Sequence, residues 1–186
     1  MLKKVTMITG GVLCVAVLAS TAHASSSTPG KSQWESDVKQ VAKPLGDYVR
    51  NRLGEAKDGD HLALVLDIDN TSIATHYDPG KPVEPILDVA EYAHEHHASI
   101  LFATNRMSSD RDDTLKQLKN AGYTVDGLCM RTDKDDSKAD VKLGCRKHFE
   151  GKGYTLVANI GNRDTDFKGG HYEKGFKLPD YDGALS

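Results

Sequence analysis

The sequence has no long hydrophobic run, no excess of basic residues and no closely spaced cysteines. Its main apolar stretch, Gly11 to Leu18, is too short to span a bilayer comfortably. A formal net charge of −3 gives no electrostatic reason to bind nucleic acid or an anionic membrane surface. None of the 3 cysteines lies at CxxC spacing, which argues against a zinc site. What remains is a chain long enough for one domain with a full core.

The N-terminal residues have the pattern of a secretory signal peptide. Two lysines precede the apolar stretch, and Ala22-His23-Ala24 is a small-x-small cleavage site. We expect residues 1–24 to be removed after Ala24, so that the protein is secreted or periplasmic and free of the membrane; a retained anchor is the alternative. Residues 25–31 would be a flexible leader, and residues 32–186 a single domain with an N-terminal helix.

Two cysteines, Cys129 and Cys145, would remain after cleavage. An exported chain reaches an oxidising compartment, where an even pair can form a disulfide. Closing a loop of about 15 residues stabilises a fold by roughly 3 kcal/mol in the chain-entropy model. We expect this disulfide, with two buried thiols as the alternative.

Strand-like and helix-like runs alternate along the rest of the chain. This order implies parallel pairing with right-handed crossovers, and so a three-layer α/β sandwich with a mostly parallel, Rossmann-like sheet. Pro44 interrupts the first helical pattern and is expected to kink or split that helix. The expected strands are 61–66, 99–103, 125–130, 154–158 and 176–178, and the expected helices are 32–56, 84–97, 108–121 and 138–150.

Two carboxylates, Asp67 and Asp69, directly follow the first strand. Alternate residues of an extended chain project to the same side, and ligands in open α/β sheets bind beyond the carboxyl ends of the strands. Because close carboxylates repel, a divalent cation is the usual remedy. The alternative is a polar loop in which an Asp caps the next helix.

Polar residues also follow the second and fourth strands, and these strand ends should meet the first at one edge of the sheet. The second strand ends in Thr104-Asn105-Arg106, and a loop from Gly161 to Asp166 follows the fourth. Carboxylates alone would repel an anion, whereas Mg²⁺ with a Thr hydroxyl and a Lys ammonium would attract one. This set of groups fits transfer of a phosphate ester.

In this order the motifs resemble those of haloacid dehalogenase (HAD) superfamily phosphatases, in the group of class B acid phosphatases and plant vegetative storage proteins. The resemblance covers about Leu62 to Pro179. The four matching stretches are Asp67-Ile68-Asp69-Asn70-Thr71 for the DxDxT signature, Phe102-Ala103-Thr104-Asn105-Arg106, Val141-Lys142 through Arg146, and Gly153-Tyr154 with Asn159-Ile160-Gly161.

The resemblance implies a role for each matching carboxylate. Asp67 would be the nucleophile that forms an aspartyl-phosphate, and Asp69 the general acid and then the base. Mg²⁺ would be held by the Asp67 carboxylate, the Asp69 backbone carbonyl and Asp166. Many relatives have Gly-Asp where this chain has Gly161-Asn162, and an amide brings no charge to the cation. Asp164, on the same loop, is the alternative inner ligand to Asp166.

The phosphoryl oxygens would be bound by Thr104 and Lys142, together with Asn105 and Arg106. Lys138, one helical turn earlier, is the alternative to Lys142. Arg106 would contact substrate or pair with nearby acids.

The intervals between the motifs are too short for a separate cap domain. An uncapped site implies a broad enzyme for small phosphomonoesters, and a second copy of the chain could supply a lid. We therefore expect a secreted, Mg²⁺-dependent acid phosphatase, which leaves homo-oligomerisation open. The alternatives are a weakly active storage or binding protein on the same fold and a phosphotransferase with the same intermediate.

Overall fold

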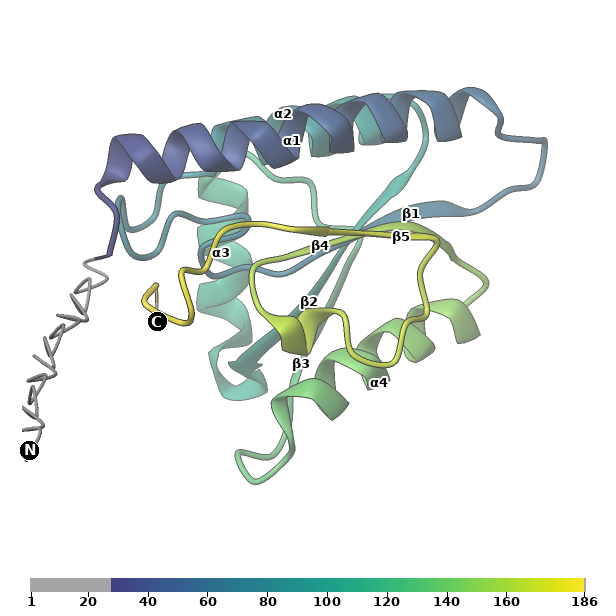
Figure 1. The fold of residues 1–186 in the computed structure, drawn as a ribbon. Helices are drawn as coiled ribbons and strands as arrows, with labels where there is room; N and C mark the ends of the chain where they lie inside the picture. The colour runs from purple at the N-terminus through teal and green to yellow at the C-terminus, as the bar shows by residue number, and fades with distance from the viewer. Residues whose placement is uncertain (1–27, 186) are drawn as a thin grey trace, which may run out of the picture.

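One parallel sheet organises the computed structural model, which describes residues 28–185 (Figure 1). The expected signal peptide and the start of the leader lie outside these residues. Within them the strand order is β3-β2-β1-β4-β5, and every neighbouring pair is parallel, which confirms the expected α/β class. The strands are β1 (Leu62–Leu66), β2 (Ser99–Met107), β3 (Gly127–Arg131), β4 (Thr155–Gly161) and β5 (Lys174–Lys177).

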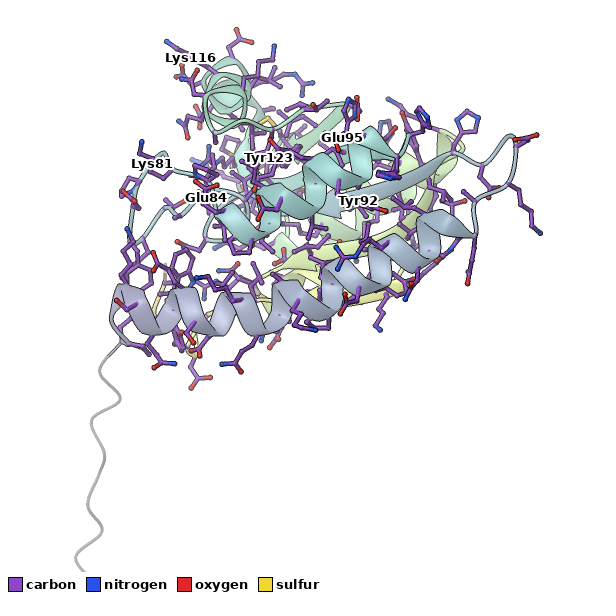
Figure 2. All side chains as sticks on the ribbon, turned by 90° about the horizontal axis from the view of Figure 1, so that it is seen from above. Lys81, Glu84, Tyr92, Glu95, Lys116 and Tyr123 are labelled. Carbon is purple, nitrogen blue, oxygen red and sulfur yellow. A yellow bond between two sulfur atoms is a disulfide. The ribbon has the colours of Figure 1, made fainter. Side chains whose placement is uncertain are left out.

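Helices cover both faces of this sheet. In Figure 1, α1 and α2 lie on one face and α4 lies on the other. Figure 2 shows α1 and α2 running side by side, with Glu84 and Glu95 labelled near the two ends of α2. The α-helices are α1 (Lys31–Gly54), α2 (Glu84–Glu95), α3 (Arg111–Asn120) and α4 (Lys138–Gly151), and the short 3-10 turns are η1 (Ser108–Asp110) and η2 (Asp164–Asp166).

The side chains of β1 alternate between two apolar clusters. Leu64 and Leu66 belong to the larger cluster, which contains the buried faces of α1 and α2. Ala63 and Val65 belong to the smaller cluster, together with residues of α4. All five residues of β1 are therefore buried, as expected for a strand inside a parallel sheet.

The helix α1 is continuous through Pro44, so of the two expected effects, a kink or a split, the split does not occur. Pro44 lies on the exposed side of the helix, where water can satisfy the carbonyl that loses its N–H partner. The opposite side of α1 packs on the core of its own chain. Glu173, just before β5, accepts hydrogen bonds from Arg52 Nε at 2.8 Å and Tyr48 Oη at 3.1 Å, which ties α1 to that edge.

Two strands extend beyond their apolar runs, because neighbouring strands pair with their polar ends. Thr104 of β2 pairs with Met130 of β3, and Gly161 of β4 pairs with Lys177 of β5. The third helix, expected from residue 108, begins only at Arg111, because Ser108 and Ser109 lie in the 3-10 turn η1. Among residues 28–185, no helix has both the length and the apolarity needed to cross a membrane.

Cys129 of β3 and Cys145 of α4 form the expected disulfide, with their Cα atoms 5.6 Å apart. It lies on the α4 face of the sheet, in and beside the smaller apolar cluster. The bond thus joins an edge strand to the helix that covers this face.

Candidate active site

The candidate site lies where the strand order reverses direction. From β1 the chain proceeds through β2 to β3 on one side, and then crosses to β4 and β5 on the other. Such a switch point opens a crevice at the carboxyl ends of the strands. The Asp67 N–H donates to the Ile160 carbonyl of β4 at 2.9 Å, so the end of β1 is tied to the strand across the switch.

A pocket of about 720 Å³ occupies this crevice. The carboxyl ends of β1, β2 and β4 meet in it, as the strand-end pattern predicts, and α4 adds Lys142. Of the proposed site residues, those that line the pocket are Asp67, Asp69, Thr104, Asn105, Arg106, Lys142, Asn162 and Asp166. Asp164 is the one that does not.

A network of hydrogen bonds holds the turn that carries Asp67 and Asp69. Ser72 Oγ donates to the Asp67 carbonyl at 2.7 Å, and Asn70 Oδ1 accepts from the His76 N–H at 2.7 Å. Asn70 Nδ2 donates to the Leu185 carbonyl at 2.5 Å, which brings the C-terminal segment against the same turn. Asn70 has φ 55°, a conformation that asparagine tolerates better than most residues. The turn is therefore fixed by its own sequence and by a distant segment.

Lys142 bridges two carboxylates inside the pocket. Its Nζ contacts Asp67 Oδ1 and lies 2.7 Å from Asp166 Oδ1, and the side chain is only 3% exposed. Burial lowers the pKa of Lys142, but the charges of the two aspartates outweigh burial and raise it overall. Lys138 is exposed at the edge of the pocket, so the structure favours Lys142 over Lys138 as the inner lysine.

The pKa of Asp67 is raised to about 6. Burial is the largest cause and the nearby Asp166 charge adds to it, while the Lys142 ammonium acts in the opposite direction. A cation in the pocket would act in the same direction as Lys142 and lower the pKa of Asp67, because positive charge favours the carboxylate.

Asp69 forms a bidentate ion pair with Arg106. Arg106 Nε lies 3.0 Å from Oδ2 and Nη2 lies 2.7 Å from Oδ1, and Thr75 Oγ1 also donates to Oδ1 at 2.9 Å. Burial raises the pKa of Asp69, yet the hydrogen bonds and charge of Arg106 hold it below its usual value. Of the two roles open to Arg106, the structure shows pairing with an acid, in a side chain that also lines the pocket.

The loop after β4 separates its two acids. Asp166 is buried, and its Oδ2 accepts a hydrogen bond from the Arg163 N–H at 2.9 Å. Asp164 points away, with a side chain 91% exposed and paired to Lys177 Nζ at 2.6 Å. The structure therefore favours Asp166 over Asp164 as the inner ligand, because the η2 turn directs Asp166 into the pocket.

The oxygen atoms around Asp166 suit a hard divalent cation. Asn162 Oδ1 and Asn105 Oδ1 are buried acceptors without a hydrogen-bond partner among the described residues, and both residues line the pocket. Asp67 and Asp166 add two carboxylates, which touch the same ammonium. Among residues 28–185, no group of three or more His, Cys, Asp or Glu side chains could hold a metal. A cation here would thus depend on two carboxylates, an amide oxygen and a backbone carbonyl, a set typical of Mg²⁺.

Several pocket residues were not predicted from the sequence. Thr75 and Leu185 line the pocket, as do Arg131 and Arg163. The sequence offered a signal for Asn70, since asparagine often adopts the left-handed conformation in turns. It offered none for Leu185, which lies far from the other pocket residues along the chain.

The chain was compared with known proteins. Residues 75–184 match the family model described as HAD superfamily, subfamily IIIB (acid phosphatase). The matched range contains Thr104, Lys142 and Asp166, while Asp67 and Asp69 precede it. The comparison with curated proteins gives no match.

Solved structures similar to this chain include two of the class C acid phosphatase from Bacillus anthracis. One has a TM-score of 0.63 and the tungstate-bound form 0.61, each at 16% identity and covering 83% of both chains. A Pnkp1/Rnl/Hen1 complex has a TM-score of 0.55 at 17% identity, covering 67% of this chain and 47% of its own. At these identities the likeness concerns the fold.

Proposed function

This chain belongs to subfamily IIIB of the HAD superfamily, the acid phosphatases, and on that premise we propose an exported, Mg²⁺-dependent phosphomonoesterase that forms an aspartyl-phosphate. It is a phosphoric monoester hydrolase by family. The proposal on mechanism depends above all on one observation, the contact of Lys142 with Asp67 and Asp166 at the switch point of the sheet.

In the first step the Asp67 carboxylate attacks phosphorus while the bond to the leaving oxygen breaks. Asp67 is held for this attack by its neighbours, since its backbone is tied to Ile160 and Ser72. The Lys142 ammonium lies against Asp67 Oδ1, where it can also bind a phosphoryl oxygen and stabilise the charge of the transition state. Thr104 is buried, and its Oγ1 accepts from the Arg106 N–H at 3.2 Å, which leaves its O–H as a donor.

Asp69 would give its proton to the leaving oxygen and then take a proton from the water that releases phosphate from Asp67. Its side chain is 41% exposed, so solvent and leaving group both have access to it. The ion pair with Arg106 keeps the pKa of Asp69 low, so the protonated form that donates is populated at acidic pH. This agrees with an acid phosphatase.

Phosphatases of this superfamily generally use a divalent metal, and we propose Mg²⁺ as the ion. The residues that would hold it are Asp67, Asp166 and the backbone carbonyl of Asp69, with Asn162 Oδ1 as a fourth oxygen. When bound, the ion neutralises the negative charge of the phosphate and of the two carboxylates. Many relatives have a third carboxylate at the position of Asn162. Because the Asn162 amide brings no charge, we expect weak binding of Mg²⁺.

The substrates are small phosphate esters. Within residues 28–185, no inserted domain interrupts the path from β1 to β2 or from β2 to β3. We propose that the open pocket accepts many leaving groups outside the cytoplasm, after cleavage at Ala24. Transfer to an alcohol in place of water would use the same aspartyl-phosphate.

One assay tests the proposal. The mature chain is incubated with an aryl phosphate across pH, with Mg²⁺ or with EDTA, beside Asp67→Asn and the control Asp164→Asn. We expect activity to be lost in Asp67→Asn and in EDTA. The control Asp164→Asn should keep wild-type activity, since Asp164 faces solvent. Activity retained in Asp67→Asn would contradict the mechanism, and activity retained in EDTA would contradict the metal. A wild type inactive on every phosphomonoester would favour a binding or storage protein.

A further inference from the structure

Arg146 is a buried cation whose hydrogen-bond partners are backbone carbonyls. The residue has no exposed surface, and its guanidinium donates three hydrogen bonds. Nη1 lies 2.5 Å from the carbonyl of Asp166, Nη2 lies 2.6 Å from that of Lys168, and Nε lies 2.6 Å from that of Gly170. One side chain thus holds three alternate residues of the loop that follows β4.

Burying a charge is costly, because the group gives up its hydration. Burial accordingly lowers the pKa of Arg146. An apolar side chain of similar length would fill the same space without that cost, and it could not hold the loop. The three carbonyls, together with the Tyr172 ring 5.5 Å away, are what compensate the charge.

The loop that Arg146 holds carries Asp166. Arg146 and Lys142 are four residues apart on α4, so they project from the same face of the helix. Lys142 contacts the Asp166 carboxylate, and Arg146 contacts the Asp166 carbonyl. The same helix face therefore sets both the side chain and the backbone of this one residue.

The surroundings leave Asp166 little freedom to shift. Asn159 Nδ2 also donates to the Asp166 carbonyl, at 3.0 Å. A Cβ atom at Gly161 would lie 2.3 Å from Asp166 Oδ2, so the carboxylate packs directly on the strand end. A displacement of the loop backbone would move the carboxylate away from Lys142 and Asp67.

We propose that Arg146 is a positioning residue of the phosphatase site, which sets Asp166 for the cation through the backbone of the loop. The inference rests on the proposed function, because it assigns Asp166 to Mg²⁺. Arg146 touches neither the substrate nor the ion in this scheme, and its effect passes through Asp166.

The test compares Arg146→Lys and Arg146→Met with the wild type. Lysine keeps the charge but cannot span three carbonyls, and methionine keeps only the volume. We expect Mg²⁺ affinity, measured by calorimetry on purified protein without substrate, to fall about tenfold in Arg146→Lys and further in Arg146→Met. With Mg²⁺ below saturation, kcat should fall while KM for an aryl phosphate stays within twofold.

A double-mutant cycle separates positioning from general loss of structure. If Arg146 acts through Asp166, Arg146→Lys should weaken Mg²⁺ binding no further in an Asp166→Asn background. Arg111→Lys is the control, since among residues 28–185 Arg111 donates only to the Leu128 carbonyl, at 3.1 Å, and it lies outside the pocket. It should bind Mg²⁺ like the wild type.

Three results would overturn the inference. Wild-type Mg²⁺ affinity and kcat in folded Arg146→Lys would overturn it and leave the proposed function standing. An equal loss of affinity in the Asp166→Asn background would show that Arg146 does not act through Asp166. A wild type that neither binds Mg²⁺ nor hydrolyses phosphate esters would remove both proposals. Because Arg146→Lys is the milder change, it decides the question even if Arg146→Met does not fold.

Discussion

At the scale of single residues, Arg106 sets the protonation of the group that must donate a proton. Its two hydrogen bonds to Asp69 stabilise the carboxylate and so lower the pKa of that carboxyl. A general acid works only while protonated, so activity should fall as pH rises through this pKa. Asp67 has the opposite requirement, since a nucleophile must be ionised. Burial raises its pKa, and bound Mg²⁺ would lower that pKa and keep the carboxylate ionised at acidic pH.

Arg106→Gln should therefore move the alkaline limb of the pH–activity profile to higher pH. Without the guanidinium, the pKa of Asp69 rises, and the protonated acid persists to higher pH. The measurement is kcat against pH with saturating Mg²⁺. Arg131→Gln is the control, because Arg131 lines the same pocket but donates to the carbonyls of Asp133 and Asp136. An alkaline limb that stays in place in Arg106→Gln would contradict the role given to Asp69.

Asn162 is the residue that limits the charge around the cation. Its Oδ1 is buried and has no hydrogen-bond partner within residues 28–185, and a carboxylate there would give the ion a third negative ligand. Asn162→Asp should tighten Mg²⁺ binding by about tenfold, measured by calorimetry. It should also lower the melting temperature without Mg²⁺, because a third carboxylate near Asp67 and Asp166 adds repulsion.

The matched control for this substitution is Asp164→Asn on the same loop. Asp164 is solvent-exposed and paired with Lys177, so its loss should leave Mg²⁺ affinity unchanged. Asn162→Asp with wild-type affinity would show that residue 162 is not a ligand.

At the scale of elements, α4 unites most of what the site needs. It contributes Lys142 to the pocket, Arg146 to the loop after β4 and Cys145 to the disulfide. Cys145 and Arg146 lie three and four residues after Lys142, so each is next to Lys142 on the helix surface. The disulfide links this helix to β3 across a sequence separation of 16 residues.

Loss of the disulfide should lower the free energy of unfolding by about 3 kcal/mol, since a loop of this length gains that much chain entropy when opened. Urea denaturation with and without a thiol reductant measures the difference. The double variant Cys129→Ser with Cys145→Ser is the control and should be insensitive to reductant. A wild type whose midpoint does not change on reduction would contradict the prediction.

At the scale of the whole molecule, the strand order creates the site and leaves it open. The crossing from β3 to β4 returns the chain to the far side of β1, which brings Asp67 and Asp166 to one crevice. The C-terminal segment closes one side through Leu185, whereas no inserted domain of residues 28–185 covers the top.

An open pocket should discriminate weakly among leaving groups. We expect kcat/KM for an aryl phosphate, a sugar phosphate and a nucleoside monophosphate to differ by less than about a hundredfold, the range of a few pocket contacts. Initial rates at fixed pH and Mg²⁺ measure these ratios. A preference above that range would imply a lid, from a second copy of the chain or from another protein.

The sequence by itself determined the parallel α/β fold, the family motifs and the strand-end positions of Asp67, Asp69 and Thr104. These follow from local information, because a buried strand needs an apolar run and a parallel sheet places its strand ends together. The motifs named Lys142 and Asp166 first, and tertiary structure supplied a physical reason to prefer them over Lys138 and Asp164. Each pair lies close together in the sequence, and only packing determines which member is buried.

The partners of Asn70 and Arg146 came from tertiary structure alone, and tertiary structure also identified Asp69 as the acid that pairs with Arg106. Arg106, Leu185 and the carbonyl of Asp166 are remote in sequence from the groups they contact. Hydrophobic periodicity carries no information on such pairs, because it records which face of an element is buried and not which polar group it meets. The sequence thus identified the chemical groups of the site, and the fold decided how each is charged, held and oriented.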